Sequence, residues 1–372
     1  MWEKELYNNW HIKVAESIMR RDTQAHPHWT YDDGVIWNGF AALYGVTGDT
    51  RYFRYIQEGI DTFLLDDGAA IRDYSPDEYN IDHINNGKQL LYLFDKTGDQ
   101  RYKRAADLLM TQLQTHPRTV EGGFWHKQIY PFQMWLDGIY MGSPFYTRYT
   151  FMFGPDSAYD DIARQIRLCY THTLDAQTGL HYHAWDEKHA QFWANPETGC
   201  SRHFWGRAMG WFVAALVDVL DFFPEEHTAY AEITGYLTAC MKALLAVQDA
   251  KSGVWYQVLD QGTRPGNYLE ASASCLNVYA LAKGIRKKWL PKSMAPAAIR
   301  GWEGIITQFV ELYKGNVDLN KTCRVAGLGN TEERDGTFAY YMRESIICND
   351  LKGLGAFLQA AVEVEGLHSL LV

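Results

Sequence analysis

The sequence predicts an all-α fold, an (α/α)6 barrel of six helical hairpins with short β-hairpins at one mouth. The first observation behind this prediction is a repeat: residues 42–64 and 92–113 share the motif T-G-D-x-R-Y, fifty residues apart in a chain of 372. Each copy predicts a helix, a Gly-Asp turn and a second helix, with Asp49 and Asp99 placed to cap the second helices. The repeated unit is therefore an αα-hairpin, and repeats of this length are typical of solenoids and closed arrays.

The second observation is a set of segments that are apolar around much of the helix circumference, as expected for buried helices. These predicted inner helices cover residues 37–46, 85–97, 135–153, 205–223, 271–285 and 350–365. More polar helices are predicted between them, at residues 51–64, 100–115, 157–173, 226–248 and 298–315. Six buried helices with polar helices around them predict a closed toroid that forms one domain over residues 1–372.

The third observation is a Gly turn followed by aromatic residues that alternate with polar ones, at residues 121–128, 178–186 and 252–260. Such alternation indicates short extended segments or small β-hairpins. Because these segments fall between the helical hairpins, we expect them at one mouth of the barrel.

Composition limits the partners of the protein. Asp plus Glu total 45 against 35 for Lys plus Arg, a net charge of −10 without a basic run, which argues against nucleic acid and anionic membrane surfaces. Residues 1–21 lack the uninterrupted apolar core of a secretory signal, and no apolar run reaches transmembrane length, so neither a signal peptide nor a membrane span is expected in this sequence. The six cysteines are scattered, which suits reduced thiols, so a cytoplasmic protein is expected.

Residues suited to chemistry gather in the first turns of the predicted inner helices and in the loops before them. Flat aromatic faces beside carboxylates suit sugar binding, although large aromatic residues also simply fill a wide barrel. The candidates are Trp37, Asp82, Trp135, Asp137, His183, Trp205, Arg207 and Trp211.

Asp137 is the leading candidate because it lies in "QMWLDGIYMG" (133–142), among large apolar and aromatic residues. A carboxylate near the start of a helix can simply be a cap. Desolvation by these neighbours would instead raise the pKa of Asp137 toward the range of a general acid. Asp82, followed by His83, has a more polar setting, so the two carboxylates are a candidate acid/base pair.

Arg207 follows Trp205 by two positions and shares a helix face with Trp211. An Arg beside an indole can bind a carboxylate or form a cation–π pair, and a salt bridge to a barrel acid is an equal alternative. His183 is a candidate donor to a sugar, or a packed core histidine. The histidines of residues 181–189 lack metal-ligand spacing, and no metal or organic cofactor is expected.

Five segments together resemble glycoside hydrolase family 105, the unsaturated rhamnogalacturonyl hydrolases. The similarity runs in the right order over roughly residues 30–365. The segments are "YNIDHINNGKQLLYLFDKTGDQRY" (79–102), "PFQMWLDGIYMGSPFYTRY" (131–149), "TGLHYHAWDE" (178–187), "FWGRAMGWF" (204–212) and "ESIICNDLKGLGAFLQA" (344–360).

The resemblance implies an (α/α)6 barrel with Asp137 as general acid/base and Asp82 as its partner. It also implies binding residues around an unsaturated uronate, namely His183, Trp205, Arg207 and Trp211. Trp37 and Trp135 are added here as expected sugar contacts. The loops with Asp32, Asp33 and Arg343 depart from the family pattern, so the resemblance does not identify the sugar that is linked to the uronate.

The function implied is removal of 4,5-unsaturated galacturonate from the nonreducing end of pectin (rhamnogalacturonan) lyase products, by hydration of the C4=C5 double bond. The partner would be a small oligosaccharide, an unsaturated uronate disaccharide. Three alternatives remain open: an unsaturated glucuronyl hydrolase acting on other lyase-generated oligosaccharides, a sugar epimerase with histidine acid/base pairs, and a non-catalytic barrel that binds oligosaccharide.

Overall fold

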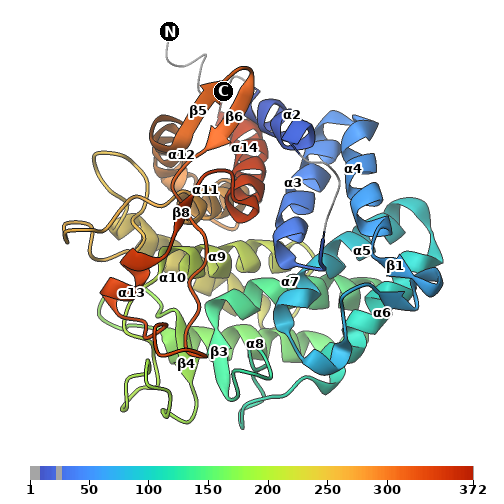
Figure 1. The fold of residues 1–372 in the computed structure, drawn as a ribbon, viewed down its shortest axis with the longest axis horizontal. Coiled ribbons are helices and arrows are strands. Elements are labelled where there is room, and N and C mark those ends of the chain that lie inside the picture. Colours follow the sequence, from blue (N-terminus) through green and yellow to red (C-terminus); the bar gives the residue numbers. More distant parts are fainter. Residues whose placement is uncertain (1–8, 22–26, 372) are drawn as a thin grey trace.

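A ring of inner helices forms the barrel in the computed structural model, which describes residues 9–21 and 27–371. Each inner helix packs against the next one along the chain, and the last packs against the first, so the ring closes (Figure 1). The predicted (α/α)6 barrel is therefore confirmed. The inner helices of the described chain are α3 (Tyr31–Thr47), α5 (Gly87–Thr97), α7 (Leu136–Phe153), α9 (Gly206–Leu220), α11 (Ala271–Arg286) and α14 (Leu351–Leu371).

An outer helix packs on each inner helix and shields it from solvent. The sequence predicted five of these helices and missed α2, which packs on α14 and α3. Its buried Trp10, Val14 and Ile18 recur every four residues, which gives the helix one apolar face. Within the described ranges the outer helices are α2 (Trp10–Arg21), α4 (Thr50–Asp61), α6 (Gln100–Thr115), α8 (Ala158–Thr173), α10 (Tyr230–Ala246) and α12 (Ala295–Phe309).

The repeated T-G-D-x-R-Y motif forms the predicted turns. Its glycines end α3 and α5 in the left-handed region, at φ of 70° and 71°, where a residue without Cβ is favoured. The Asp49 side chain accepts a hydrogen bond from the Arg51 amide, and Asp99 accepts one from the Arg101 amide. Both outer helices are capped as the sequence predicts.

Two inner helices show why the apolar segments had no polar face. All of α9 is buried except Asp218, and all of α11 is buried except Arg286. A helix enclosed on every side needs apolar or small residues around its whole circumference. Among the described helices, none is long and apolar enough to cross a bilayer.

Short antiparallel strand pairs lie between the helices, and only part of the hairpin prediction is correct. Residues 178–186 contribute β4, but it pairs with β3 from another segment, while residues 121–128 and 252–260 form isolated bridges. The strand pairs are β1 (Leu64–Leu65) with β2 (Ala70–Ile71), β3 (Gln133–Trp135) with β4 (Ala184–Asp186), β5 (Val310–Tyr313) with β6 (Asn316–Leu319), and β7 (Thr322–Cys323) with β8 (Ile346–Ile347).

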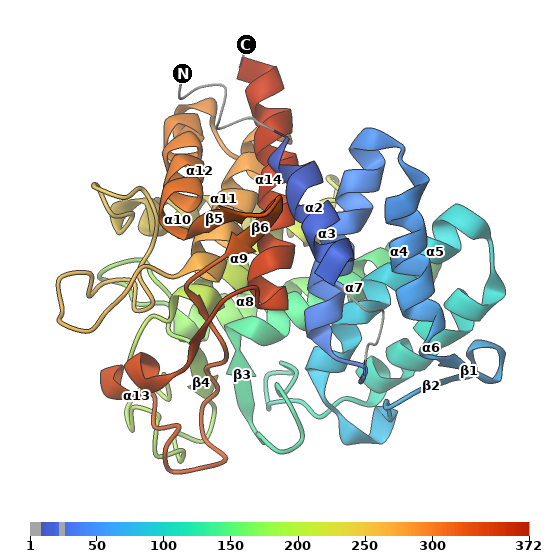
Figure 2. The ribbon, with the colours of Figure 1, turned by 45° about the horizontal axis from the view of Figure 1, so that its top comes forward.

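The β3–β4 pair marks one mouth of the barrel. The helix α13 (Phe338–Arg343) lies beside these strands in both views, whereas the end of α14 lies on the opposite side of the molecule (Figures 1 and 2). A 3₁₀ helix, η3 (Ile81–Asn86), precedes α5 and packs against α3 and α7. The segments that flank the inner helices therefore meet at this mouth.

The closure of the ring predicts a sensitive glycine. A Cβ on Gly355 of α14 would lie 2.6 Å from the carbonyl of Val35 in α3, so Gly355→Ala must push two backbones apart. We expect it to lower the free energy of unfolding by about 2 kcal/mol or more, measured in urea. The control is Gly235→Ala on α10, where no atom lies within 4 Å of the added Cβ. An equal loss in both variants would contradict close packing at Gly355.

Candidate active site

A cavity of about 160 Å³ opens at the β3–β4 mouth, where α3, α7 and α9 begin. Asp82 and Asp137 both line it, as do Trp135, Trp205 and Arg207, so the structure brings together five of the eight predicted site residues. Residues 325–327 of the segment before α13 also line this cavity. We refer to it as the mouth cavity.

Asp82 is held in η3 by local hydrogen bonds and by a cation. The Asn80 side chain accepts a hydrogen bond from the Asp82 amide at 3.1 Å, so Asn80 caps this helix and the Asp82 carboxylate is free to face the cavity. The Lys127 Nζ lies 2.6 Å from Oδ2 of Asp82, and the His126 Nε2 lies 3.5 Å from its Oδ1.

The charges around Asp82 determine its ionisation. Burial alone would raise the pKa of this carboxyl, but the Lys127 ammonium and then His126 outweigh burial, and the pKa lies below its ordinary value. Burial lowers the pKa of His126 to about 4, although the Asp82 carboxylate acts in the opposite direction. At neutral pH the site therefore contains an ionised Asp82, a neutral His126 and a charged Lys127.

Asp137 follows β3 and lies in the first turn of α7. The N-cap residue of this helix is Trp135, and Oδ2 of Asp137 accepts no hydrogen bond from the described residues, so that oxygen does not cap the helix. The backbone pairing of β3 with β4 continues as a hydrogen bond from the Leu136 amide to the His183 carbonyl, at 3.1 Å. This bond fixes His183 next to Asp137, with Nε2 3.4 Å from Oδ2.

His183 is fully buried, and a contact on the side of its imidazole that faces away from Asp137 sets its orientation. Its Nδ1 lies 2.9 Å from the Tyr341 hydroxyl of α13. Across the part of the chain that the structure describes, neither Nε2 of His183 nor Oδ2 of Asp137 has a hydrogen-bond partner. Asp137 lines the cavity and His183 lies behind it, and each has a polar atom that can form a further hydrogen bond.

Arg207 is buried, with 1% of its surface exposed, and is fixed by neutral acceptors. It donates to the carbonyl oxygens of Cys323 and Arg324 and to the Ser272 hydroxyl, and its guanidinium lies 4.8 Å from the Trp205 ring centroid. No carboxylate of the described residues forms an ion pair with Arg207. The predicted salt bridge to a barrel acid is therefore absent there, whereas the predicted cation–π contact is present.

The remaining tryptophans differ in position. Trp135 stacks on His126 at a centroid distance of 4.4 Å and on Tyr130 at 4.9 Å, at the cavity wall. Trp211 lies behind the wall, 4.4 Å from the Tyr140 ring. Trp37 lies elsewhere: a Cβ on Gly59 of α4 would be 2.7 Å from its indole, so this side chain packs on an outer helix. Trp37 is not among the residues that line the mouth cavity, so the predicted sugar contact is not seen at this site.

Sequence reasoning missed several residues of the site. His126 and Lys127 belong to residues 121–128, which were noted only as a possible hairpin, although an adjacent His and Lys in a mouth segment is a usable signal. Tyr341 and residues 325–327 belong to the segment between β7 and β8. Its sequence has no local pattern from which its path could be predicted. Among the residues described, no group of three or more His, Cys, Asp or Glu side chains is arranged to hold a metal ion.

The relatives of the chain identify its family. The family model described as Glycosyl Hydrolase Family 88 matches residues 4–368. The chain is also 47% identical to a glycoside hydrolase from family 105 of C. acetobutylicum ATCC 824, with a TM-score of 0.94 over 96% of this chain and 99% of that one. The chain belongs to glycoside hydrolase family 105.

Two other relatives bear on this family 105 hydrolase. YesR of Bacillus subtilis (strain 168), named an unsaturated rhamnogalacturonyl hydrolase, is 30% identical over 290 residues, which are 76% of this chain and 79% of YesR. The unsaturated glucuronyl hydrolase of Bacillus sp. GL1 is 15% identical, covers 97% of this chain and 96% of its own, and has a TM-score of 0.68. That second likeness is one of fold alone. The family resemblance predicted from the motifs is confirmed, and the protein is a glycoside hydrolase that binds oligosaccharides.

The Lys127–Asp82 contact generates a testable prediction. In Lys127→Met the burial of Asp82 is no longer offset by a nearby ammonium, so the pKa of Asp82 should rise, as followed by carbon-13 NMR of the carboxyl. Because the folded-state pKa of Asp82 is lowered, its stabilising contribution exists above about pH 4 and is lost as the pH falls. This acid-sensitive part of stability should disappear in the variant. The control is Lys96→Met, which removes a lysine from an exposed ion pair. An unchanged titration of Asp82 in Lys127→Met would show that Lys127 does not lower the pKa of Asp82.

Proposed function

We propose that this family 105 hydrolase removes 4,5-unsaturated galacturonate from the nonreducing end of rhamnogalacturonan lyase products. One observation carries the proposal: two carboxylates line the same cavity, Asp82 2.6 Å from the Lys127 ammonium and Asp137 beside His183, with its Oδ2 making no hydrogen bond in the described chain. Two carboxylates with different neighbours at one cavity suit a division between electrostatic support and proton transfer. The name of the relative YesR supports the choice of substrate.

The cavity has the groups that an uronate needs. Arg207 carries a charge without a carboxylate partner among the described residues, and Lys127 supplies a second cation at the same wall. A planar guanidinium matches a carboxylate in a two-point contact. The Trp205 and Trp135 rings offer flat faces for the sugar, which the double bond flattens at C4 and C5.

The proposed reaction is the hydration of an enol ether. The C4=C5 bond carries the ring oxygen on C5, so a proton delivered from Asp137 to C4 leaves positive charge on C5 and that oxygen. The Asp137 carboxylate then takes a proton from water as the water oxygen bonds to C5. The resulting hemiketal opens to a ketone at C5, and the hemiacetal at C1 collapses to an aldehyde and releases the second sugar.

Two neighbours assist Asp137 in this scheme. The ionised Asp82 stabilises the positive charge that develops at C5, because opposite charges attract strongly in a site sheltered from water. His183, 3.4 Å from Asp137 and oriented by Tyr341, positions the carboxyl group. Because the proton and water add to a double bond, the spacing rule for ordinary glycosidase carboxylates does not govern this pair.

A panel of lyase-generated disaccharides tests the proposal. Loss of the ultraviolet band of the unsaturated uronate, fastest with galacturonate linked to rhamnose, is the expected result. Faster loss with unsaturated glucuronyl disaccharides would favour the glucuronyl alternative. Binding without loss of the band would identify a non-catalytic barrel, and conversion at unchanged mass an epimerase.

The thiols support a cytoplasmic location for this function. In the described chain all six cysteines are free, and five of them are buried. Free cysteines are typical of proteins in a reducing compartment. We therefore propose that the enzyme acts on disaccharides inside the cell.

Asp137→Asn tests the role of the acid. It keeps the side-chain shape but cannot carry the proton, so kcat should fall by about 10²-fold or more, with KM changed by less than about threefold. The measurement is the rate of loss of the ultraviolet band. Asp95→Asn, at an exposed position on α5, is the matched control and should retain full activity. Near-normal turnover of Asp137→Asn would refute the assignment.

A further inference from the structure

A second cavity lies between the inner helices, farther along α7, α9 and α11 than the mouth cavity, and the partly exposed Arg286 and Lys287 are at its edge. It measures about 270 Å³, and its lining residues come from all six inner helices but include none of those that line the mouth cavity. On α7, Arg148 follows Asp137 by eleven residues, which corresponds to about 16 Å along the helix axis. We call this space the inner cavity.

The charges of the inner cavity do not balance. Five basic side chains line it, against the three acids Asp218, Asp221 and Glu363. Three of the basic residues pair with these acids: Lys283 lies 2.6 Å from Asp218 and 2.7 Å from Asp221, Lys287 2.9 Å from Asp221, and Arg286 2.7 Å from Glu363. Lys88 and Arg148 remain, and they supply two cationic groups beyond what the acids neutralise.

Lys88 is the most unusual group of this cavity. It is 94% buried, and its Nζ has no hydrogen-bond partner in the described chain. The ammonium lies 3.9 Å from the Tyr140 ring centroid, which supplies a cation–π contact but no acceptor. A buried ammonium without an acceptor is costly, so its retention points to a partner that arrives from solution.

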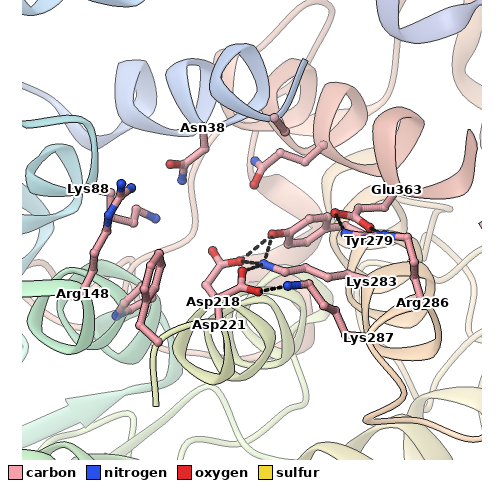
Figure 3. A pocket seen from close by; sticks show the side chains of 14 residues that line it. Asn38, Lys88, Arg148, Asp218, Asp221, Tyr279, Lys283, Arg286, Lys287 and Glu363 are labelled. Atoms are coloured by element: carbon pink, nitrogen blue, oxygen red, sulfur yellow. Dashed lines mark hydrogen bonds and ion pairs between the residues drawn. The ribbon is translucent and has the colours of Figure 1, made fainter. Parts of the chain in front are cut away.

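Arg148 lies beside Lys88 on the same wall. Both side chains stand across the cavity from the ion-pair network around Asp218 (Figure 3). The Nε of Arg148 is buried without a hydrogen-bond partner among the described residues, and its guanidinium lies 5.1 Å from the Phe222 ring. Two adjacent cationic donors thus face one space.

We propose that the inner cavity is a second binding site, which holds a small oxyanion between Lys88 and Arg148. A water molecule takes about 30 Å³ of liquid volume, so the space has room for a phosphate, a sulfate or a small carboxylate together with its waters. Charge-assisted hydrogen bonds from an ammonium and a guanidinium suit such oxygens. The site is separate from the mouth cavity and does not depend on the substrate proposed above.

Sulfate titration by calorimetry tests the proposal, with phosphate and acetate as parallel probes. The wild-type enzyme should bind one sulfate, and its melting temperature should rise by about 2 °C or more in sulfate relative to chloride at equal ionic strength. Lys88→Met and Arg148→Met should each weaken binding about tenfold or more. Lys88→Met removes a buried charge, so its melting temperature in chloride should be no lower than that of wild type. If Lys88→Met is destabilised, Arg148→Met still tests the site.

Two control variants locate the binding. Lys242→Met removes an exposed lysine of α10, and Lys127→Met removes the cation of the mouth cavity, so both should bind sulfate as wild type does. Sulfate binding that persists in Lys88→Met and in Arg148→Met but is lost in Lys127→Met would belong to the mouth cavity and would overturn the proposal. Absence of binding for all three probes would also overturn it. Binding of acetate alone that requires Lys88 would support the site and assign it to carboxylates.

The pH dependence gives an independent readout. Burial lowers the pKa of Lys88 to about 7, although Asp218 acts in the opposite direction, so the amine loses its charge above that pH. Sulfate keeps its charge between about pH 6 and about pH 9, so its affinity should fall across this range in wild type and not in Lys88→Met. The groups that face Lys88 are Arg148 and Tyr140 of α7, Asp218 and Asp221 of α9, Tyr279 and Lys283 of α11, and Glu363 of α14. A pH-independent sulfate affinity in wild type would contradict a role for Lys88.

Discussion

The close packing of α14 against α3 is the contact on which the rest of the structure depends. Gly355 lets the two backbones approach to a distance that leaves no room for a side chain, and this approach closes the ring. Near the mouth the same seam is held by Lys352, whose Nζ lies 2.9 Å from Asp32 and 3.0 Å from Asp350. Without closure, the first turns of the inner helices would not converge, and neither cavity would have its full wall.

The site depends on a second contact, the short pairing of β3 with β4. One backbone hydrogen bond, from Leu136 to the His183 carbonyl, joins residues of different hairpins and sets the acid beside the imidazole. Asp82 reaches the same cavity by another route, through η3 and the Asn80 cap. The two carboxylates therefore come from different elements, and their surroundings differ: Asp82 lies against a cation, and Asp137 lies against a neighbour with spare bonding capacity.

Much of the fold was predictable because its signals are local. The T-G-D-x-R-Y turns, the fully apolar inner helices and the clustering of Asp82, Asp137 and Arg207 at helix starts all follow from short stretches of sequence. Trp37 was misplaced because periodicity gives the position of a residue along a helix but not the direction that it faces in a fully buried one. His126, Lys127 and Tyr341 were missed because long connections carry them, and the path of such a connection depends on tertiary packing.

The order of the hairpins along the chain has a consequence for synthesis. The ring closes only when its final helix meets its first, so a chain emerging from the ribosome exposes the receiving face of α3 until α14 has been made. That face is apolar: Val35 and Ile36 lie beside Gly355 and are buried in the finished barrel, and Gly39 lies against Leu358. Exposed apolar surface on a nascent chain invites aggregation and attracts chaperones. Residues 325–327, which complete the wall of the mouth cavity, come shortly before α14, so the same part of the chain completes both the cavity and the ring.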